Sequence, residues 1–346
     1  MVLCYKASVS ELPASVDVAI IGGGFAGLAT AWALGRRGVN AIVLEREPAL
    51  GRFASGRGAG LGRQLAEDDA TTSLTIRGAA MLRTDLSAAW TPTSGVLGFD
   101  DAALAEVYTA RAARHGLAVR PLDRDAVLGY WNALDGLVTT AGLFVQTDGV
   151  IDAKLLLHLY AASAHIELAC GVSHVAPGGI GAQVMTTRGT IEARLVVDAS
   201  GAWAGMLTGD APLDVFKRHL FVLEATARAD TPWIWHLGRQ ELYARTDSDG
   251  VLVCVCDASR ETPGDAQPDE IGASAMRAIL GRAAPDWDGR AVKRAWACQR
   301  SFTPERTMRI GRDPARPWLV WAAGLGGHGA TASAAVGESV ADAIGA

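Results

Sequence analysis

Residues 16–45, VDVAIIGGGFAGLATAWALGRRGVNAIVLE, constrain the fold of this chain more than any other stretch. An apolar run leads into three glycines, a helix of small residues follows, and a second apolar run ends at Glu45. This pattern is typical of a nucleotide-binding βαβ unit. Gly22 allows the tight turn, Gly24 lets the backbone approach a pyrophosphate, and Gly27 lets the helix pack closely on the strand. Glu45 lies where a carboxylate can accept both ribose hydroxyls, so the stretch predicts a dinucleotide site without choosing between NAD and FAD.

The composition indicates an ordinary globular protein. With 346 residues, 49% of them hydrophobic and 20% charged, the chain can bury a full core in two domains or one composite domain. The net charge of −5 gives no basic field for a phosphate backbone, so we expect no nucleic-acid partner. Residues 1–15 contain no apolar signal core, and glycines interrupt the apolar stretch 16–34. We therefore expect no membrane segment and a cytoplasmic location.

Five scattered cysteines, Cys4, Cys170, Cys254, Cys256 and Cys298, are too few for a disulfide framework in a chain of this length. No CxxC pair or nearby histidine pair completes a zinc-ligand set. We therefore expect reduced thiols and no metal site.

Helices and strands are expected along the whole chain. A loop rich in glycine and arginine follows Glu45, and a loop of this length and composition is typical of a ligand-binding segment. Periodicity and capping residues predict helices at 70–89, 101–115, from Asp123, from Asp152 and at 270–281, and strands at 96–99 and 142–145. Three successive strands are predicted at 166–177, at 182–193 and from residue 194 to a small-residue turn at 199–203.

The pattern changes after residue 217. Residues 217–257 alternate as strands do and contain a DSDG hairpin turn at 247–250, which predicts an antiparallel sheet in a different domain. We expect the substrate to meet the cofactor there. The end of the chain predicts a buried strand at 318–321, the glycine loop GLGGHGA and a helix at 331–344. The free N–H groups of that helix would favour negative charge on whatever the loop holds.

Six motifs follow one another along the chain: GGGFAG with Glu45, FASGRGAG, DGVID, VVDASGAWA, LYARTDSDG and GLGGHGATASAAVG. In this order they resemble the D-amino-acid oxidase-like (DAO) superfamily of FAD-dependent oxidoreductases. They are most similar to its branch of glycine oxidase, sarcosine oxidase and the D-amino-acid and D-arginine dehydrogenases. The resemblance covers nearly the whole chain.

The resemblance implies an α/β composite fold. A Rossmann-like FAD-binding βαβ domain with a central parallel sheet would be joined to a substrate domain built on a mixed, mainly antiparallel sheet. The expected FAD-binding domain is discontinuous and comprises residues 1–90, 145–210 and 290–346. The expected substrate-binding domain comprises residues 91–144 and 211–289.

The resemblance also assigns residues to FAD. The glycines of the first turn, Glu45 and Arg46 would hold the ADP half, and Val172 would meet the adenine through its backbone. Residues 326–330 would lie beside the flavin N1–C2=O edge, where backbone N–H groups stabilise the charge of the reduced ring. The full set is Gly22, Gly24, Phe25, Ala26, Gly27, Glu45, Arg46, Ser55, Gly56, Arg57, Val172, Ala199, Ser200, Gly201, Trp203, Arg300, Gly326, Gly327, His328, Gly329 and Ala330.

The family reaction moves a hydride from the carbon that bears an amine to flavin N5, and water hydrolyses the resulting imine. Arg300 matches the arginine that clamps the substrate carboxylate, and Tyr243 resembles the tyrosine of the same pocket. Arg218, at the start of the substrate sheet, is a third candidate, and Arg63 and His236 are weaker ones. The expected substrate is a small amino acid or N-alkyl amino acid.

Several alternatives remain at this stage. The same scaffold oxidises 2-hydroxy acids and glycerol phosphate, and it also serves as the flavin subunit of heteromeric amine or opine oxidases. Cys298 aligns with the flavin-linking cysteine of sarcosine oxidase, whereas glycine oxidase binds FAD without a covalent bond, the mode we favour. The electron acceptor is oxygen, a quinone or another carrier. The VLVCVCD stretch lacks the lysine with which sarcosine oxidase activates oxygen, which favours a dehydrogenase.

Overall fold

The computed structural model describes residues 11–210, 212–228 and 230–346. Residues 1–10 lie outside the described part, and with them Cys4, Lys6 and most of the stretch expected to lack a signal core. Within the described residues, every helix is too short or too polar to cross a bilayer.

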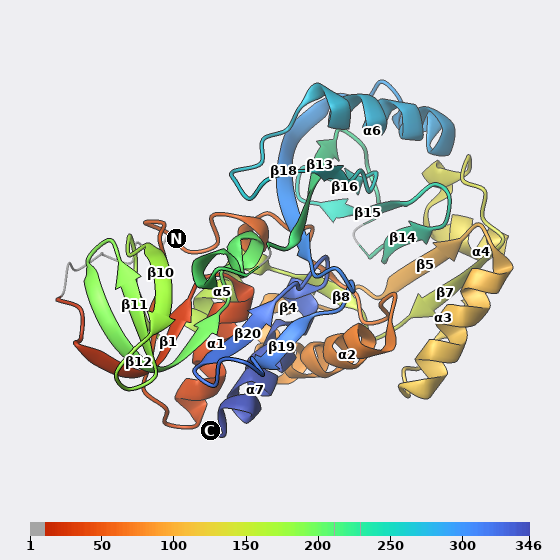
Figure 1. The fold of residues 1–346 in the computed structure, drawn as a ribbon. Helices are drawn as coiled ribbons and strands as arrows, with labels where there is room; N and C mark the ends of the chain where they lie inside the picture. The colour runs from red at the N-terminus through yellow and green to blue at the C-terminus, as the bar shows by residue number, and fades with distance from the viewer. Residues whose placement is uncertain (1–10, 211, 229) are drawn as a thin grey trace.

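Two large β-sheets, each with its own helices, divide the chain into two lobes (Figure 1). The first sheet has eight strands in the order β10-β11-β12-β1-β2-β9, with β20 added to β12 and β19 added to β20. Its strands are β1 (Ser15–Ile21), β2 (Ala41–Leu44), β9 (His165–Glu167), β10 (Val172–Pro177), β11 (Ala182–Thr186), β12 (Gly189–Asp198), β19 (Arg309–Arg312) and β20 (Leu319–Ala323). Strands β1, β2, β9, β12 and β20 run parallel, as expected for a nucleotide-binding sheet.

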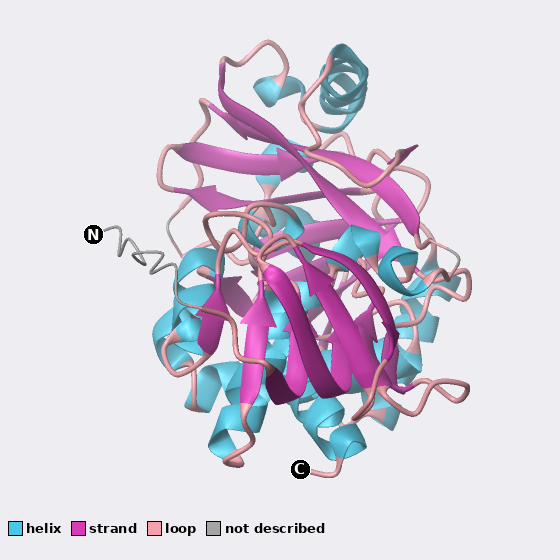
Figure 2. Cartoon of the chain, turned by 60° about the vertical axis from the view of Figure 1, so that its left-hand side comes forward, coloured by secondary structure: helices cyan, strands magenta, loops and turns pink. Residues whose placement is uncertain are grey.

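Helices pack against this sheet, and Figure 2 shows them behind its strands. Helices α1 (Phe25–Arg36) and α7 (Gly329–Ile344) contact the strands, while α2 (Asp69–Thr84) packs on α7 and α5 (Ala153–Ala161) packs on α1. Small residues allow close approach, because a Cβ at Gly337 of α7 would lie 2.3 Å from the Ala29 carbonyl oxygen of α1. A Cβ at Gly78 of α2 would likewise lie 2.1 Å from the Thr331 carbonyl oxygen of α7. These contacts fix α7, and hence the glycine loop before it, relative to α1.

The second sheet has nine strands in the order β17-β13-β16-β15-β14-β5-β7-β6, with β18 paired to β13. All its pairs are antiparallel except β5 with β14, so the expected mixed, mainly antiparallel sheet is confirmed. Its strands are β5 (Gly95–Phe99), β6 (Arg120–Leu122), β7 (Ala141–Val145), β13 (Asp214–Leu223), β14 (Trp233–Leu237), β15 (Leu242–Asp247), β16 (Gly250–Cys254), β17 (Ser259–Arg260) and β18 (Val292–Phe302).

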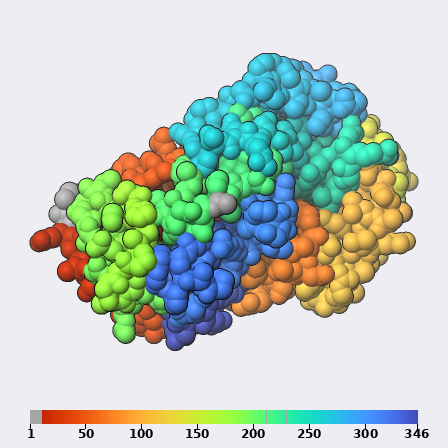
Figure 3. Space-filling model, in the orientation of Figure 1, coloured from red at the N-terminus to blue at the C-terminus, as the bar shows by residue number. Residues whose placement is uncertain are grey.

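The same lobe contains three helices, α3 (Ala102–Arg114), α4 (Arg124–Tyr130) and α6 (Glu270–Ala283). A small third sheet of β3 (Leu61–Gly62), β8 (Gly149–Ile151) and β4 (Trp90–Thr91) completes the fold. In the space-filling view, segments far apart in the sequence make up each lobe (Figure 3).

Three expectations differ from the structure. Helix α2 ends at Thr84 rather than residue 89, since the Leu86 N–H donates to the Met81 carbonyl oxygen and turns the chain away. The segment 166–177 is divided at Ala169, which has a left-handed φ of 50°, so that β9 and β10 lie at opposite edges of the sheet. A turn at residues 187–188 divides the segment 182–193, and β12 continues through its end to Asp198.

The expected domain boundary at residue 290 does not coincide with a sheet boundary. Strand β18 pairs with β13 along its whole length, from Asp214↔Phe302 to Leu223↔Val292. We therefore propose the expected division with one change, in which the substrate domain continues to Phe302.

Candidate functional site

The turn between β1 and α1 has no room for side chains. Gly22 has a φ of 106°, which L-residues rarely adopt, and a Cβ there would lie 2.6 Å from the Ala199 carbonyl oxygen. A Cβ at Gly27 would lie 2.0 Å from the Gly22 carbonyl oxygen. Gly27 does not itself line the cavity described below, because it lets α1 pack onto the turn.

The N-terminus of α1 opens onto a long cavity. Gly24 provides no side-chain cap, and the Phe25 N–H donates instead to Ser55 Oγ at 2.9 Å. Ser55 belongs to the loop that the sequence predicts to contact a ligand. Helix N-terminal N–H groups together with a hydroxyl form a site suited to a pyrophosphate.

Glu45 follows the end of β2 and is 9% exposed. Its Oε2 accepts from the Gly23 N–H at 2.6 Å, and its Oε1 accepts from the Glu47 N–H at 2.8 Å. Burial raises the pKa of Glu45, while these backbone donors oppose the rise. The carboxylate is therefore fixed at the cavity wall, and its remaining lone pairs can accept ribose hydroxyls.

Aromatic side chains surround the same end of the cavity. The Arg46 guanidinium carbon lies 3.7 Å from the centre of the Trp203 ring and 4.7 Å from that of Phe53. The two rings are 4.9 Å apart. Val172 lines the same cavity as Arg46, Phe53 and Trp203. The aromatic rings give the cavity flat surfaces that suit a planar base.

The closing glycine loop forms the opposite part of the cavity, between β20 and α7. The Gly326 N–H donates to the Ser301 carbonyl oxygen of β18 at 3.1 Å. A Cβ at Gly327 would lie 2.9 Å from an Arg300 guanidinium nitrogen, so this glycine lets Arg300 lie directly against the loop. The loop and the first turn of α7 thus supply backbone N–H groups next to a fixed cation.

Arg300 and Tyr243 meet in the cavity, as the sequence suggests. An Arg300 N–H donates to the Tyr243 hydroxyl oxygen at 3.2 Å. Burial raises the pKa of Tyr243 well above its usual value, so the phenol keeps a proton that it can donate to a ligand. The Trp235 ring lies 4.8 Å from that of Tyr243, and its indole N–H donates to Glu241. A guanidinium and a phenol pointing at one place can hold a carboxylate.

Arg63 also lines the cavity, although the sequence gives it little weight. It is 2% exposed, and its guanidinium carbon lies 4.3 Å from the centre of the Trp235 ring. An Arg63 N–H donates to Glu67 at 2.6 Å, and the other Glu67 oxygen contacts His328 Nε2 at 2.8 Å. Glu67 therefore holds the His328 ring in place. The sequence offers only the ligand-loop composition around Arg63 as a signal.

Most of the expected site residues line this one cavity. They are Gly22, Gly24, Phe25, Ala26, Glu45, Arg46, Ser55, Val172, Ala199, Ser200, Gly201, Trp203, Tyr243, Arg300, Gly326, Gly327, His328, Gly329 and Ala330, together with Cys298. Gly27, Gly56, Arg57, Arg218 and His236 are not among its lining residues.

The side chains outside the cavity serve other contacts. Arg57 pairs with Asp265 at 2.5 Å, and its guanidinium also donates to the Ala266 carbonyl oxygen. Arg218 lies opposite Cys298 in the β13–β18 register, and one of its nitrogens is buried without a partner. His236 is buried, and its Nδ1 contacts the Gln240 carbonyl oxygen. Arg57 and Arg218 are thus not lining residues, and a role for Arg218 stays a prediction, since it is paired with the cavity-lining Cys298.

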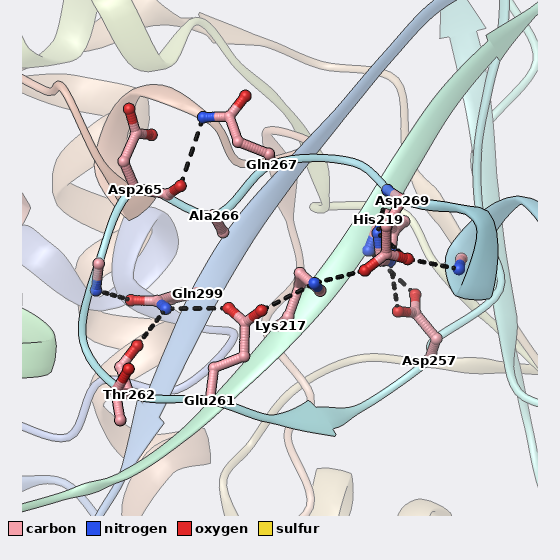
Figure 4. A network of polar contacts seen from close by, with 12 residues as sticks. Lys217, His219, Asp257, Glu261, Thr262, Asp265, Ala266, Gln267, Asp269 and Gln299 are labelled. Atoms are coloured by element: carbon pink, nitrogen blue, oxygen red, sulfur yellow. Dashed lines mark hydrogen bonds and ion pairs between the residues drawn. The ribbon is translucent and has the colours of Figure 1, made fainter.

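A polar network holds the segment 257–269 against β13 and β18 (Figure 4). Lys217 pairs with Glu261 at 2.7 Å and with Asp269 at 2.6 Å, and His219 contacts Asp257 at 2.7 Å. Gln299 donates to Glu261 and to the Thr262 carbonyl oxygen. These charged groups pair with one another, so we assign the network to holding this segment in place.

Comparison with known proteins identifies the fold family. The family model described as FAD dependent oxidoreductase (DAO) matches residues 17–343. A curated relative, the tRNA 5-methylaminomethyl-2-thiouridine biosynthesis bifunctional protein MnmC of Thiobacillus denitrificans, is 28% identical over 372 aligned residues. That alignment covers 98% of this chain but 58% of MnmC, so this chain spans little more than half of the relative's length.

Solved structures share the whole fold. L-Proline dehydrogenase from P. horikoshii has a TM-score of 0.87 and 21% identity, covering 96% of this chain and 93% of that one. Glycine oxidase from Geobacillus kaustophilus has a TM-score of 0.83 and 22% identity, covering 96% and 95%. Because the family model matches the chain from β1 to α7, this chain belongs to the DAO family of FAD-dependent oxidoreductases.

Proposed function

We propose that this enzyme oxidises the C–N bond of a small amino acid or N-alkyl amino acid. The observation that carries the proposal is the pair of Arg300 and Tyr243, which meet in the cavity beside the closing glycine loop. An arginine stays protonated at any working pH, and the tyrosine keeps its proton. Together they would bind the substrate carboxylate and leave the adjacent carbon facing the loop.

The residues of the cavity fit FAD. The turn at Gly22–Gly24 and the Ser55 hydroxyl would hold the pyrophosphate, Glu45 the ribose, and Trp203 with Val172 the adenine end. Residues 326–330 would face the flavin ring, with the N-terminus of α7 behind them. When bound, FAD supplies the acceptor for the hydride. The protein then has to orient the substrate and exclude water.

Two finer points follow from single residues. Burial raises the pKa of Cys298, so its sulfur is held as a thiol, and we propose that FAD is bound without a covalent link. Of the described lysines, Lys154, Lys217 and Lys293, none lines the cavity, and Lys217 is engaged by two carboxylates. This favours transfer of electrons to a carrier such as a quinone over direct oxidation by oxygen.

The test is an anaerobic screen of the purified holoenzyme for loss of flavin absorbance. The compounds screened are amino acids of both chiralities, N-methyl and N-carboxymethyl amino acids, 2-hydroxy acids and glycerol phosphate. The screen also includes tRNA that carries 5-methylaminomethyl-2-thiouridine, the nucleoside in the name of MnmC. Reduction by the amine panels supports the proposal. Reduction by hydroxy acids or glycerol phosphate alone, or by the tRNA alone, overturns it.

An Arg300→Gln variant tests the carboxylate site. Each charge-assisted hydrogen bond contributes about 1.5–3 kcal/mol, so the variant should bind carboxylate substrates about ten- to hundredfold more weakly. Arg77→Gln, at an exposed position of α2, is the matched control.

Reoxidation of the reduced enzyme by oxygen and by a quinone compares the electron acceptors. Copurification of a second chain would identify a flavin subunit of a larger complex. A yellow pellet after acid precipitation would contradict noncovalent binding.

A further inference from the structure

Arg63 is a buried cation with one nitrogen unaccounted for. Its Nε–H donates to the Leu65 carbonyl oxygen at 2.7 Å, and one terminal nitrogen donates to Glu67, but the other has no partner. Buried polar groups are almost always hydrogen-bonded, so such an exception calls for an explanation. Among the described residues with an unpartnered buried side-chain atom, Arg63 alone lines the cavity.

Arg63 and Arg300 both lie close to the ring of Trp235. Their guanidinium carbons lie 4.3 and 5.9 Å from the centre of the Trp235 ring. The two carbons are therefore at most about 10 Å apart, because their separation cannot exceed the sum of their distances to the ring centre. The indole N–H bond to Glu241 and the contact with Tyr243 hold this ring in place. Both guanidinium groups thus belong to residues that line one cavity, within about 10 Å of each other.

We propose that Arg63 binds a second anionic group of the substrate, so that this enzyme prefers amino acids or N-substituted amino acids with two carboxylates. Aspartate, glutamate and N-carboxymethyl amino acids have this chemistry. Arg300 would hold the carboxylate next to the reacting carbon, and the Arg63 guanidinium would hold the other. The inference rests on the proposed function, which it narrows from small amino acids to dianionic ones.

Glu67 orients Arg63 without occupying its free nitrogen. One Glu67 oxygen accepts from Arg63 and the other contacts His328, so both oxygens are already engaged. The Glu67 side chain is 52% exposed, and water screens its charge. With the Nε–H and one terminal nitrogen fixed, the plane of the guanidinium is set, and so is the direction of the remaining N–H groups. Glu67 is therefore a positioning residue.

A binding titration tests the subsite without turnover. Unreactive ligands are added to the holoenzyme, and binding is followed by the change in the flavin absorbance spectrum. The dicarboxylates are malonate, succinate and glutarate, and their matched monocarboxylates are acetate, propionate and butyrate. We expect at least one dicarboxylate to bind about tenfold or more tightly than its matched monocarboxylate, as one added charge-assisted hydrogen bond would give. Equal affinity for both classes would overturn the proposal.

Variants assign the difference to Arg63. Arg63→Gln should weaken dicarboxylate binding by a larger factor than monocarboxylate binding and so remove the preference, whereas Arg77→Gln should preserve both affinities. An equal loss for both classes in Arg63→Gln would refute a separate subsite. If that variant fails to fold, Glu67→Gln takes its place, because freeing the guanidinium should weaken dicarboxylate binding selectively. The wild-type comparison stands whether or not either variant folds.

The reductive half-reaction separates the two proposals. If dicarboxylates bind tightly but no amine reduces the flavin, the subsite stands and the proposed function fails. If alanine or N-methylglycine reduces the flavin at a lower concentration than aspartate, glutamate and iminodiacetate do, the proposed function stands and the Arg63 subsite fails.

Discussion

A methyl group added at Gly27 tests the packing on which the cofactor site depends. In Gly27→Ala the new Cβ would lie 2.0 Å from the Gly22 carbonyl oxygen. Cβ atoms in proteins do not approach other atoms closer than 3.0 Å, so α1 or the glycine turn must move by at least about 1 Å. The obstacle is a backbone atom, which has no rotamer with which to move aside.

The structure allows an estimate of the effect. Helix α1 is buried along most of its length, and a gap of up to about 1 Å forfeits a quarter to a half of each dispersion contact across it. We therefore expect a loss at the upper end of the usual overpacking range, about 3 kcal/mol, and a melting temperature lower by roughly 5 °C. The N-terminus of α1 and the glycine turn would move with the helix, so FAD should also bind more weakly.

The same helix offers a control. A Cβ at Gly35 meets nothing within 4 Å, and alanine in a helix is about 0.5–1 kcal/mol more favourable than glycine. Gly35→Ala should therefore be neutral or stabilising. Thermal unfolding followed by circular dichroism, with the ratio of flavin to protein absorbance, compares the two variants. If Gly27→Ala retained the melting temperature and FAD content of Gly35→Ala, the inferred close packing would be wrong.

Two further perturbations concern buried carboxylates. Both Glu45 oxygens accept hydrogen bonds from backbone N–H groups, so in Glu45→Gln the amide must turn its NH2 group toward one of these donors. The affinity for FAD should therefore fall about 5- to 150-fold. Fluorescence titration of the apoprotein with FAD measures this affinity, and an unchanged value would contradict the proposed contact of Glu45 with the ribose. Burial raises the pKa of Asp148 to about 7 in the folded protein, above its unfolded value of about 3.9. The folded state therefore holds an extra proton between these values, and its stability should fall as the pH rises from about 4 to 7 and level off above. Asp148→Asn should lessen that fall in urea unfolding measured across the pH range, and an unchanged slope would refute the assignment.

The cofactor half of the site is predictable because it is encoded locally. The glycine turn, its helix and Glu45 lie within thirty residues, and each has a separate requirement that sequence displays. The hairpin at Asp247–Gly250 and the N-cap of α5 at Asp152 are also confirmed, since both depend on neighbouring residues. Local signals of this kind need no knowledge of distant pairing.

The substrate half depends on pairing between distant strands, which sequence does not display. Strand β14 is buried at all five positions, so no alternation indicates that Trp235 faces the cavity. Arg63 lies in a loop without periodicity, and only the folded chain brings it to that ring. Arg218 stays a prediction, because it does not line the cavity, although the β13–β18 register pairs it with Cys298 and so places both side chains on the same face of the sheet.

Strand β18 joins the two halves of the site. It pairs with the whole of β13 in the substrate sheet, and its end contacts the closing loop through the Ser301 carbonyl oxygen and the Gly326 N–H. Arg300 lies beside that contact, with Gly327 against its guanidinium. In the proposed site, this backbone contact would set the distance between a carboxylate held by Arg300 and the flavin. Substitutions at Arg63 or Trp235 would then change which substrate is held, while the proposed orientation at Arg300 is kept.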